Sequence, residues 1–421
     1  MSTQDKMTID ERWKYLRTMK KRYVKAGQKE RAHLLDEMEA VTGLHRKSLI
    51  RLMNDSLERK PRRKQRGRTY GPEMDDALRV ISESLDYICA DRLTPNLVWM
   101  ATHLTAHGEM DTSPLLLEQL ERVSISTVKR RLKRIGQDRP RLPRKGPRRA
   151  NQVKQDIPMK RIAWDEQEPG HFEVDLVHHC GDSASGEYAS TLQMIDIATG
   201  WSERVAVLGR SYLVMQDAFR RIVARLPFPV REIHPDNGSE FLNHHMVRFW
   251  GDLIQGVTLS RSRPYQKNDN RNVEQKNATL VRAYLGHERL DSVAQVLALN
   301  QLYDKMWCYY NLFQPVMHLI EKTVTLEEGQ PTRVKRKHDQ ARTPFDRLCG
   351  TDAIAQQCQE RLQALRDRIN PRRLRQEIYD LIDQLFDLPG AVSGVTEDVF
   401  QTLAYPISDK GDDDSDDNPC S

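Results

Sequence analysis

Hydrophobic and polar residues alternate through the middle of the chain. The segment 171–178 alternates two sets of side chains, Phe172, Val174 and Leu176 on one side and Glu173, Asp175 and Val177 on the other. A period of two residues is typical of a β-strand. Similar runs at 190–197 and 201–208 are separated by a short loop that ends in Gly200, where a hairpin favours glycine. These three segments predict an antiparallel meander.

Helical and strand periods alternate after the meander. Residues 212–226 repeat apolar positions at helical spacing, and 230–234 reads as a short strand that ends before Pro235. A helix at 240–250, a brief strand at 257–259 and a helix from Asn270 onward follow. The order β-β-β-α-β-α-β-α predicts one compact α/β layer. Asp175 then lies in a strand, Asp236 just past a strand end, and Glu274 in a helix.

Three separated carboxylates at one edge of such a layer indicate a site for a divalent metal. Hard cations such as Mg²⁺ prefer oxygen ligands and bind through a few carboxylates together with substrate phosphate. Two such ions about 4 Å apart stabilise the attacking and leaving oxygens of a displacement at phosphorus. Without metal the three acids would repel one another. The neighbouring acids Glu173 and Asp196 are interpreted as structural or solvated residues.

Two motifs carry a family resemblance. They are HPDNGSEF at 234–241, around Asp236, and RPYQKNDNRNVEQKN at 263–277, which contains Glu274, with 37 residues between the two acids. Together with the Asp175 strand, they resemble the catalytic core of DDE transposases and retroviral integrases, most closely the transposases of bacterial insertion sequences. The resemblance covers about 164–315. Where the family usually has Pro and Gly before the glutamate, this chain has Lys267 and Asn270.

The resemblance implies a fold, a site and an activity. The fold would be RNase H-like, and Asp175, Asp236 and Glu274 would be the catalytic and metal-binding triad for two Mg²⁺ ions, for which Mn²⁺ could substitute. The protein would bind the terminal inverted repeats of a mobile element, cut its 3′ ends by hydrolysis and join them to target DNA by strand transfer. Because two ends are joined in concert, the active species would be a homodimer or a higher homo-oligomer. The alternatives are a metal-dependent nuclease without strand transfer and a non-catalytic DNA-binding regulator.

The charge distribution favours nucleic acid as the partner. The chain has 421 residues, of which 30% are charged, and a formal net charge of +6. Its length suggests about three domains at ~150 residues each. Two blocks, 60–68 and 139–149, contain no acid and carry Pro and Gly, so they are predicted to be basic linkers that neutralise DNA phosphates. Their candidate contacts are Arg62, Arg63, Lys64, Arg66, Arg68, Arg144, Lys145, Arg148 and Arg149. A merely soluble tether is the alternative interpretation.

The linkers bound two regions with the layout of helix-turn-helix modules. In the first, helices at 31–38 and 45–53 flank Thr42 and Gly43, and the second helix presents Arg46, Lys47 and Arg51. The second region has helical patterns at 97–104 and 115–120. They lead to a helix at 124–134 that Ser124 or Ser126 could cap, with Lys129, Arg130, Arg131 and Lys133 as its basic side chains. Ordinary helical hairpins give similar patterns. In the core, Lys276, two residues after Glu274, is the candidate DNA contact, and Arg282 is the alternative.

These segments predict a multidomain protein with N-terminal all-α modules, a central α/β core and a mainly helical C-terminal region. The predicted boundaries are 1–59 and 73–137 for the helix-turn-helix modules, 60–72 and 138–160 for the linkers, 161–318 for the core, 319–400 for a basic and helical region, and 401–421 for an acidic disordered tail.

The C-terminal region is predicted to be mainly helical. The aromatic segment 301–312 is interpreted mainly as packing, with a stacking shelf for a DNA end as the alternative. The helices at 356–386 break at Pro371 and carry an apolar stripe. Sparse cysteines without a CxxC pair, no signal-peptide core and no long apolar run predict a cytoplasmic, nucleoid-associated protein.

Overall fold

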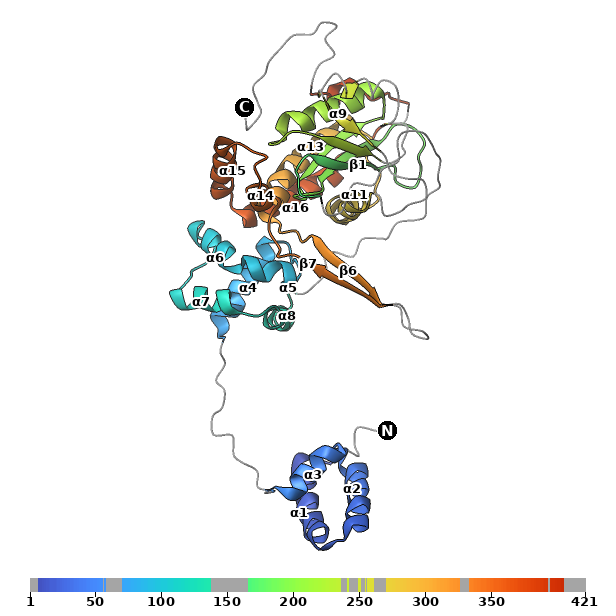
Figure 1. The fold of residues 1–421 in the computed structure, drawn as a ribbon. Coiled ribbons are helices and arrows are strands. Elements are labelled where there is room, and N and C mark those ends of the chain that lie inside the picture. The colour runs from blue at the N-terminus through green and yellow to red at the C-terminus, as the bar shows by residue number, and fades with distance from the viewer. Residues whose placement is uncertain are drawn as a thin grey trace. The chain divides into compact units, whose positions relative to one another are not determined.

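The structure is a computed structural model of the chain. It describes residues 7–55, 57, 70–137, 166–235, 241, 249–250, 254, 256–260, 270–325, 333–392 and 394–404. The chain divides into two compact units, Met1–Thr69 and Tyr70–Ser421 (Figure 1). None of the helices in the described ranges is both long enough and apolar enough to cross a membrane.

The first unit is a bundle of three helices, α1 (Ile9–Lys25), α2 (Gln28–Thr42) and α3 (Arg46–Asn54). Thr8 and Glu11 form a capping box at the start of α1, and α2 ends at Gly43, whose φ of 65° is accessible to glycine without strain. Helices α2 and α3 match the predicted pair, whereas α1 was not predicted. The buried residues include Leu16, Met19, Leu34, Leu35, Met38, Leu49 and Met53. The helix-turn-helix assignment itself stays a prediction.

The second unit begins with a helical module. Its elements are α4 (Pro72–Ser84), α5 (Ala90–Leu93), the 3₁₀ turn η2 (Thr94–Asn96), α6 (Leu97–Ala106), α7 (Pro114–Arg122) and α8 (Ile125–Arg134). Ser124 caps α8, as predicted, by accepting a hydrogen bond from the backbone N–H of Thr127. The helices α6, α7 and α8 match predicted segments. The sequence did not reveal α4, which shares one buried cluster with them.

A mixed sheet of five strands forms the centre of the second unit. Its strands are β1 (His171–His178), β2 (Ala189–Asp196), β3 (Ser202–Leu208), β4 (Glu232–Pro235) and β5 (Thr258–Leu259). They lie in the order β3-β2-β1-β4-β5, with β1, β2 and β3 antiparallel and β4 and β5 parallel to β1. The predicted meander is confirmed, and the mixed sheet with its flanking helices agrees with the predicted α/β core. Most of the helix predicted at 240–250 lies outside the described residues.

Helices cover both faces of the sheet. On one face α9 (Tyr212–Arg225) packs against Val205 and Val207 of β3. On the other face Ala206 and Leu208 share a cluster with α13 (Val293–Cys308). This second face is also covered by α11 (Arg271–Lys276), which continues through the π-helical segment η3 (Asn277–Arg282) into α12 (Ala283–Leu285). Alternation along the strands therefore separates two hydrophobic layers.

Side chains from helices satisfy the outer edge of β3. Asn311 donates to the carbonyl of Ser202 and accepts from its N–H at 3.1 and 2.9 Å, and Asn300 makes the same pair of bonds with Ala206, both at 2.9 Å. Between them, the Arg225 guanidinium donates to the carbonyl of Arg204 at 2.6 Å. An open strand edge is a template for pairing with another chain. Here two asparagines and an arginine take the place of a neighbouring strand.

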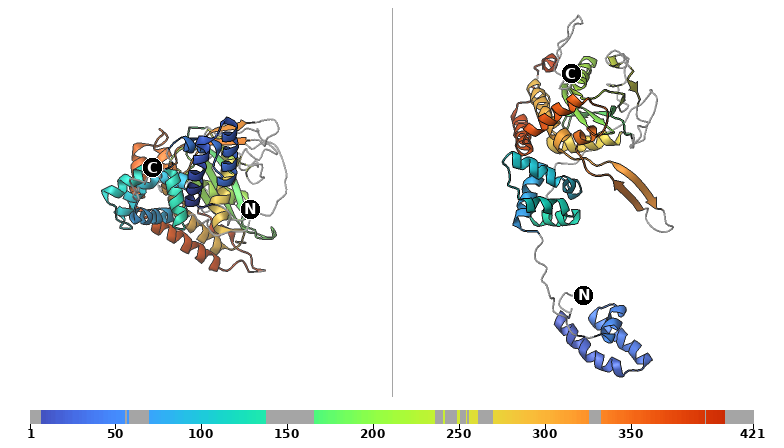
Figure 2. Two further views of the ribbon diagram at one scale, coloured as in Figure 1. Left: turned by 90° about the horizontal axis from the view of Figure 1, so that it is seen from below. Right: turned by 60° about the vertical axis from the view of Figure 1, so that its left-hand side comes forward.

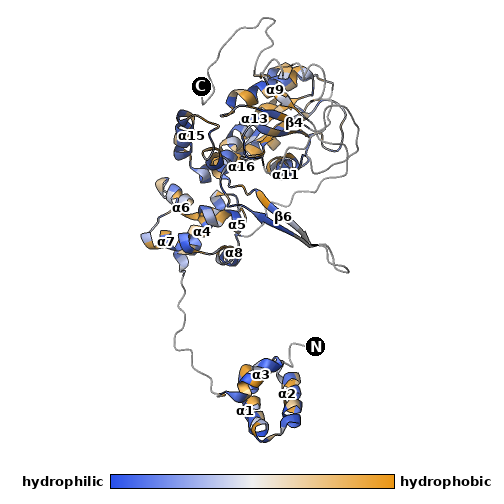
Figure 3. Cartoon of the chain, viewed as in Figure 1, coloured by the Kyte–Doolittle hydropathy of each residue, from blue (hydrophilic) through white to orange (hydrophobic). Residues whose placement is uncertain are grey.

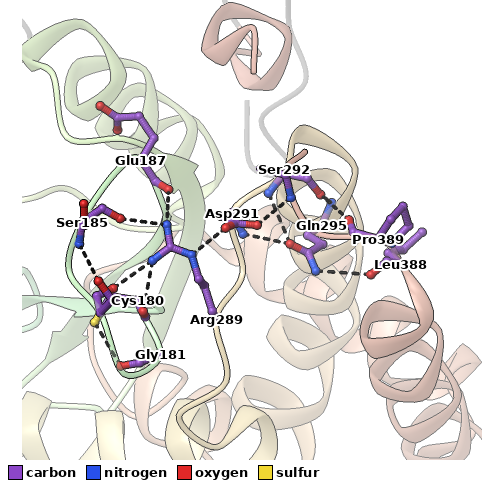
Figure 4. A network of polar contacts seen from close by, with 12 residues as sticks. Cys180, Gly181, Ser185, Glu187, Arg289, Asp291, Ser292, Gln295, Leu388 and Pro389 are labelled. Carbon is purple, nitrogen blue, oxygen red and sulfur yellow. Dashed lines mark hydrogen bonds and ion pairs between the residues drawn. The ribbon is translucent and has the colours of Figure 1, made fainter. Parts of the chain in front are cut away.

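Arg289 holds the connection between β1 and β2 (Figure 4). Its guanidinium donates to the carbonyls of Cys180, Ser183, Ser185 and Glu187 at 2.8 to 3.2 Å and to Asp291 at 2.6 Å. Ser292, at the start of α13, then contacts the C-terminal segment: its hydroxyl donates to the carbonyl of Pro389 at 2.9 Å. One short segment thus links three distant parts of the chain.

The C-terminal region contains a hairpin and several helices. They are the π-helical η4 (Tyr309–Phe313), the strands β6 (Leu319–Thr325) and β7 (Arg333–His338), the helices α14 (Pro344–Leu348), α15 (Gln356–Arg368) and α16 (Pro371–Asp387), and the 3₁₀ turn η5 (Val399–Thr402). The predicted break at Pro371 is confirmed. The apolar stripe of α16 packs inward against α13, and the aromatic residues of 301–312 are buried. The hairpin lies in the region 319–400, which was predicted to be basic and helical, so its strands were not predicted.

Asp86 joins the helical module to the rest of the second unit. The residue is buried, and both Asp86 and Tyr87 have a positive φ, 54° and 57°. Its carboxylate accepts hydrogen bonds from the hydroxyls of Tyr284 and Tyr379 and from Arg375 at 3.1 Å. A buried carboxylate is tolerated when it is paired and hydrogen-bonded in this way.

We expect Asp86→Asn to lower the unfolding free energy by about 3 kcal/mol, because it leaves the half-buried Arg375 without its anion. Asparagine keeps the size of the side chain and tolerates a positive φ, so the backbone should not contribute. Urea unfolding followed by circular dichroism measures the change. The control is Asp76→Asn, which breaks an exposed pair with Arg79 and should cost less than about 0.5 kcal/mol. Equal losses in both variants would contradict the role of Asp86.

Candidate functional site

Glu173 attaches the start of α11 to the central strand. It points to the α11 side of β1, is buried, and accepts hydrogen bonds from the backbone N–H of Val273 at 2.8 Å and from the side chain of Asn272 at 2.9 Å. The first N–H groups of a helix have no partner within the helix, and its positive end favours a carboxylate. Glu173 therefore fixes where α11 begins relative to β1. Of the two predicted roles for Glu173, structural or solvated, these contacts agree with the structural one.

Asp175 lies two residues further along the same side of β1. One carboxylate oxygen accepts from the backbone N–H of Leu176 at 2.8 Å, and the other accepts from the side chain of Asn277. Asn277 is three residues after Glu274, so the two side chains share a face of the helical segment. Asp175 and Glu274 therefore border one junction, between β1 and α11.

Asp236 lies outside the described residues. The strand before it is described: Pro235, the last residue of β4, is paired with Val174 of β1. The chain thus leaves β4 opposite the residue that precedes Asp175. Among the described residues, no group of three or more His, Cys, Asp or Glu side chains is arranged to hold a metal. The complete triad remains a prediction.

A buried polar network connects β4, the strand that ends just before Asp236 in the chain, with its two neighbours in the sheet. The Ser260 hydroxyl donates to Glu232, His234 contacts the same hydroxyl at 2.7 Å, and His171 contacts the other oxygen of Glu232 at 3.0 Å. The hydrogen bond to Glu232 raises the pKa of His171. These residues join β1, β4 and β5. No local sequence pattern indicates this network, since its members are far apart in the chain.

Asp196, the other acid considered near the site, is a structural residue. It is buried and accepts hydrogen bonds from the backbone N–H groups of Gly170 and Thr199, both at 2.8 Å, and from the Thr199 hydroxyl at 2.6 Å. Burial raises its pKa to about 6. Its hydrogen bonds close the turn between β2 and β3.

The predicted DNA contacts fall into three groups. The first group lies outside the described residues and comprises Arg62, Arg63, Lys64, Arg66, Arg68, Arg144, Lys145, Arg148 and Arg149. The second group is exposed on α3 and α8 and comprises Lys47, Arg51, Lys129, Arg130 and Lys133. The third group is engaged within the protein: Arg46 pairs with Asp36, and Arg131 is largely buried and pairs with Asp75. Arg46 and Arg131 thus connect helices, and their assignment to DNA stays a prediction.

Lys276 also differs from an exposed DNA contact. Its side chain is half-buried, and burial together with Arg92 and Arg204 lowers its pKa to about 7. Arg204 itself is fully buried, and its guanidinium lies 5.2 Å from the ring centre of Tyr310. Lys276 therefore belongs to an interior group of cations, and its assignment to DNA remains a prediction.

No protein-family profile matches the sequence. The chain is 38% identical over 307 residues to the uncharacterized protein y4rM of Sinorhizobium fredii (strain NBRC 101917 / NGR234), a match that covers 72% of this chain and 86% of that protein. The chain belongs to the y4rM family.

Solved structures similar to this y4rM-family chain include integrases. The catalytic core domain of BIV integrase matches with 19% identity and a TM-score of 0.22, covering 26% of this chain and 66% of that one. The HTLV-2 integrase catalytic core domain in complex with magnesium matches with 18% identity and a TM-score of 0.27, covering 35% and 90%. The simian T-cell lymphotropic virus intasome in complex with the PP2A regulatory subunit B56 gamma matches with 15% identity and a TM-score of 0.29, covering 51% and 70%.

For this member of the y4rM family, we expect Lys276→Met to raise the unfolding free energy at pH 7 by about 1 to 2 kcal/mol. The lysine pKa is about 7 in the folded protein and near 10.4 in the unfolded chain, so the unfolded chain binds more protons between these values. Wild-type stability should therefore rise from pH 7 to pH 10, and the variant should show a shallower rise. Urea unfolding across this range measures both effects.

Lys129→Met is the matched control, because the same change is made at an exposed position of α8. It should leave the pH profile close to that of the wild type. A Lys276→Met profile as steep as the wild-type profile would show that this lysine is not an interior cation.

Proposed function

We propose that this chain is a DDE-type DNA transposase. It would bind the terminal inverted repeats of a mobile element, cut the 3′ ends by metal-dependent hydrolysis and join them to target DNA. The observation that supports the proposal most is the junction between β1 and α11. There Glu173 and Asn277 hold the helix of Glu274 against the strand of Asp175.

The donor groups fit a hard divalent cation. Asp175 is partly exposed and Glu274 is exposed, and both offer carboxylate oxygens beside a mixed α/β sheet. Asp236 is proposed as the third ligand, because it follows β4, which is parallel to β1 and adjacent to it. When bound, magnesium ions would supply Lewis-acid activation of a water or a 3′-hydroxyl and stabilise the leaving oxygen.

The protein's own residues would orient these ligands. The N–H of Leu176 and the amide of Asn277 restrict the Asp175 carboxylate, since both of its oxygens accept hydrogen bonds. Glu173 fixes the first turn of α11, in which Glu274 lies. Positioning of this kind matters because a shift of about 1 Å in a reacting group can cost about a hundredfold in rate.

DNA would be held by exposed cations on two helices. We assign Lys47 and Arg51 of α3, and Lys129, Arg130 and Lys133 of α8, to contacts with element ends, together with the basic segments 60–68 and 139–149. Two ends must be joined to one target, so the active species would be at least a dimer. Such an enzyme would act on DNA in the cytoplasm.

We expect Asp175→Asn, Asp236→Asn and Glu274→Gln each to reduce cleavage and strand transfer by at least about a hundredfold, the scale on which loss of one transition-state-stabilising group acts. Binding to an element-end duplex should change little, because phosphate contacts come from other residues. The measurements are cleavage of an uncut end, joining of a pre-cut end and fluorescence anisotropy, all with Mg²⁺.

Asp182→Asn is the control for this series, since it removes an exposed acid from the connection between β1 and β2. The wild-type assays also separate the alternatives. Joined product supports transposition, cleavage alone indicates a nuclease, and tight binding without either reaction indicates a regulator. Binding that falls in step with activity in the triad variants would contradict a catalytic role.

We expect Lys47→Ala/Arg51→Ala to weaken binding to an element end about tenfold or more and to reduce the slope of log K against log salt by about 2, because about 0.9 counterion is released per neutralised phosphate. Both side chains are exposed on α3. The matched control is Lys14→Ala/Arg17→Ala, which removes the same charge from exposed positions of α1. The assignment of α3 to DNA fails if both double variants lose affinity equally.

A further inference from the structure

The hairpin of β6 and β7 extends away from the helices that surround it (Figures 1 and 2). Its strands are antiparallel, with Glu321 opposite Lys337, Thr323 opposite Lys335 and Thr325 opposite Arg333. Among the described strands of the second unit, β6 and β7 form a separate two-stranded sheet outside the central sheet. The ribbon is hydrophilic along most of its length (Figure 3).

The ribbon carries a concentrated positive charge. Its two strands contain five Lys or Arg residues and one Glu. Lys335, Arg336 and Lys337 are exposed and make no ion pair with any described residue. The Glu321 carboxylate, which lies opposite Lys337 in the register, accepts a hydrogen bond from the Thr323 hydroxyl at 3.2 Å. The cations are therefore available to an external anion.

The charge does not serve the stability of the ribbon. The register places Lys322 directly opposite Arg336, and like charges in directly opposed positions destabilise a strand pair. An isolated two-stranded hairpin is also marginally stable in water. The ribbon must therefore be held by its base.

Buried contacts fix that base. Arg347 is 8% exposed and donates to the Asp339 carboxylate at 2.7 Å and to the carbonyl of Val316 at 2.9 Å. Asp339 in turn accepts from the backbone N–H of His318 at 2.7 Å, just before β6 begins. From the helical module, Arg92 donates to the carbonyl of Pro315 at 2.6 Å. The ribbon thus leaves the second unit in a set direction.

The dimensions of the ribbon match a groove of duplex DNA. Neighbouring strands lie about 4.8 Å apart, and six or seven residues extend about 20 Å. The major groove of B-DNA, about 12 Å wide, admits a two-stranded ribbon, whereas the major groove of an RNA duplex is deep and narrow. Basic side chains would then reach the phosphates on either side.

We propose that the β6–β7 ribbon binds duplex DNA in the major groove and is a DNA contact separate from α3 and α8. The proposal rests on the proposed function only for the source of the DNA, which would be an element end or the target. Binding itself is tested without catalysis.

The experiment uses the full chain and a labelled DNA duplex in fluorescence anisotropy over a series of salt concentrations. Lys335→Ala/Arg336→Ala/Lys337→Ala should weaken binding about tenfold or more and reduce the salt slope by about 2 to 3, at about 0.9 per phosphate contact. The matched control is Arg122→Ala/Arg368→Ala/Arg373→Ala, which removes the same charge from exposed positions on α7, α15 and α16. Equal losses of affinity and slope in the two triple variants overturn the proposal.

Folding and groove choice are checked separately. Because the three ribbon side chains are exposed, the melting temperature should not change, and Lys335→Gln/Lys337→Gln provides a milder variant if it does. An RNA duplex of the same sequence should bind the wild type and the triple variant equally. A loss of RNA affinity as large as the loss of DNA affinity overturns the groove assignment. A wild-type protein that binds DNA through the ribbon but transfers no strand contradicts the transposase proposal alone.

Discussion

The bond between the Glu173 carboxylate and the start of α11 is the contact on which the proposed site depends. Glu173 is buried on β1 and takes its hydrogen bonds from Asn272 and from the N–H of Val273. A buried carboxylate that loses its hydrogen-bond donors costs more free energy than a buried neutral group that loses them. Separating α11 from β1 would therefore cost several kcal/mol, about the scale for an unpaired buried charge. Glu274 is the next residue after Val273, and Asp175 is the second residue after Glu173. A structural acid thus determines where two proposed metal ligands lie.

Polar contacts between residues far apart in the chain also stabilise the rest of the second unit. Asn300 and Asn311 satisfy the outer edge of β3, and Arg289 holds the connection between β1 and β2. These residues come from segments after the core motifs. The part of the core that follows the two motifs is therefore needed to complete the sheet, and the sheet edge at β3 is closed to strand addition. Contacts with other molecules must use other surfaces, and the exposed ribbon and α8 are two surfaces that carry several Lys and Arg residues.

Local patterns predicted the strands of the central sheet and most helices, because alternation and helical spacing depend on residues that are close in the chain. The strand 171–178 and the break at Pro371 were predicted to the residue. The sequence could not show that Asn277 contacts Asp175, that Asp86 joins two helical regions, or that Arg289 binds four carbonyls, since each pairs residues about one hundred or more positions apart. The sequence also could not show that Arg46 and Arg131 pair with aspartates, because a basic residue on a helix has the same local pattern whether it meets solvent or an acid.

The division into two units has a consequence for the proposed recognition of DNA. The proposed site, α8 and the ribbon all belong to the unit Tyr70–Ser421, whereas α3 belongs to Met1–Thr69. Elements of one unit hold their cations in a fixed arrangement. Little conformational entropy of the protein would therefore be lost when DNA binds to them. A second unit that is linked to the first through the polypeptide adds affinity mainly because the link raises the effective concentration of its binding surface near the bound DNA. On this reasoning, the second unit would set the register of the DNA relative to Asp175 and Glu274, and the first unit would mainly select which DNA is held.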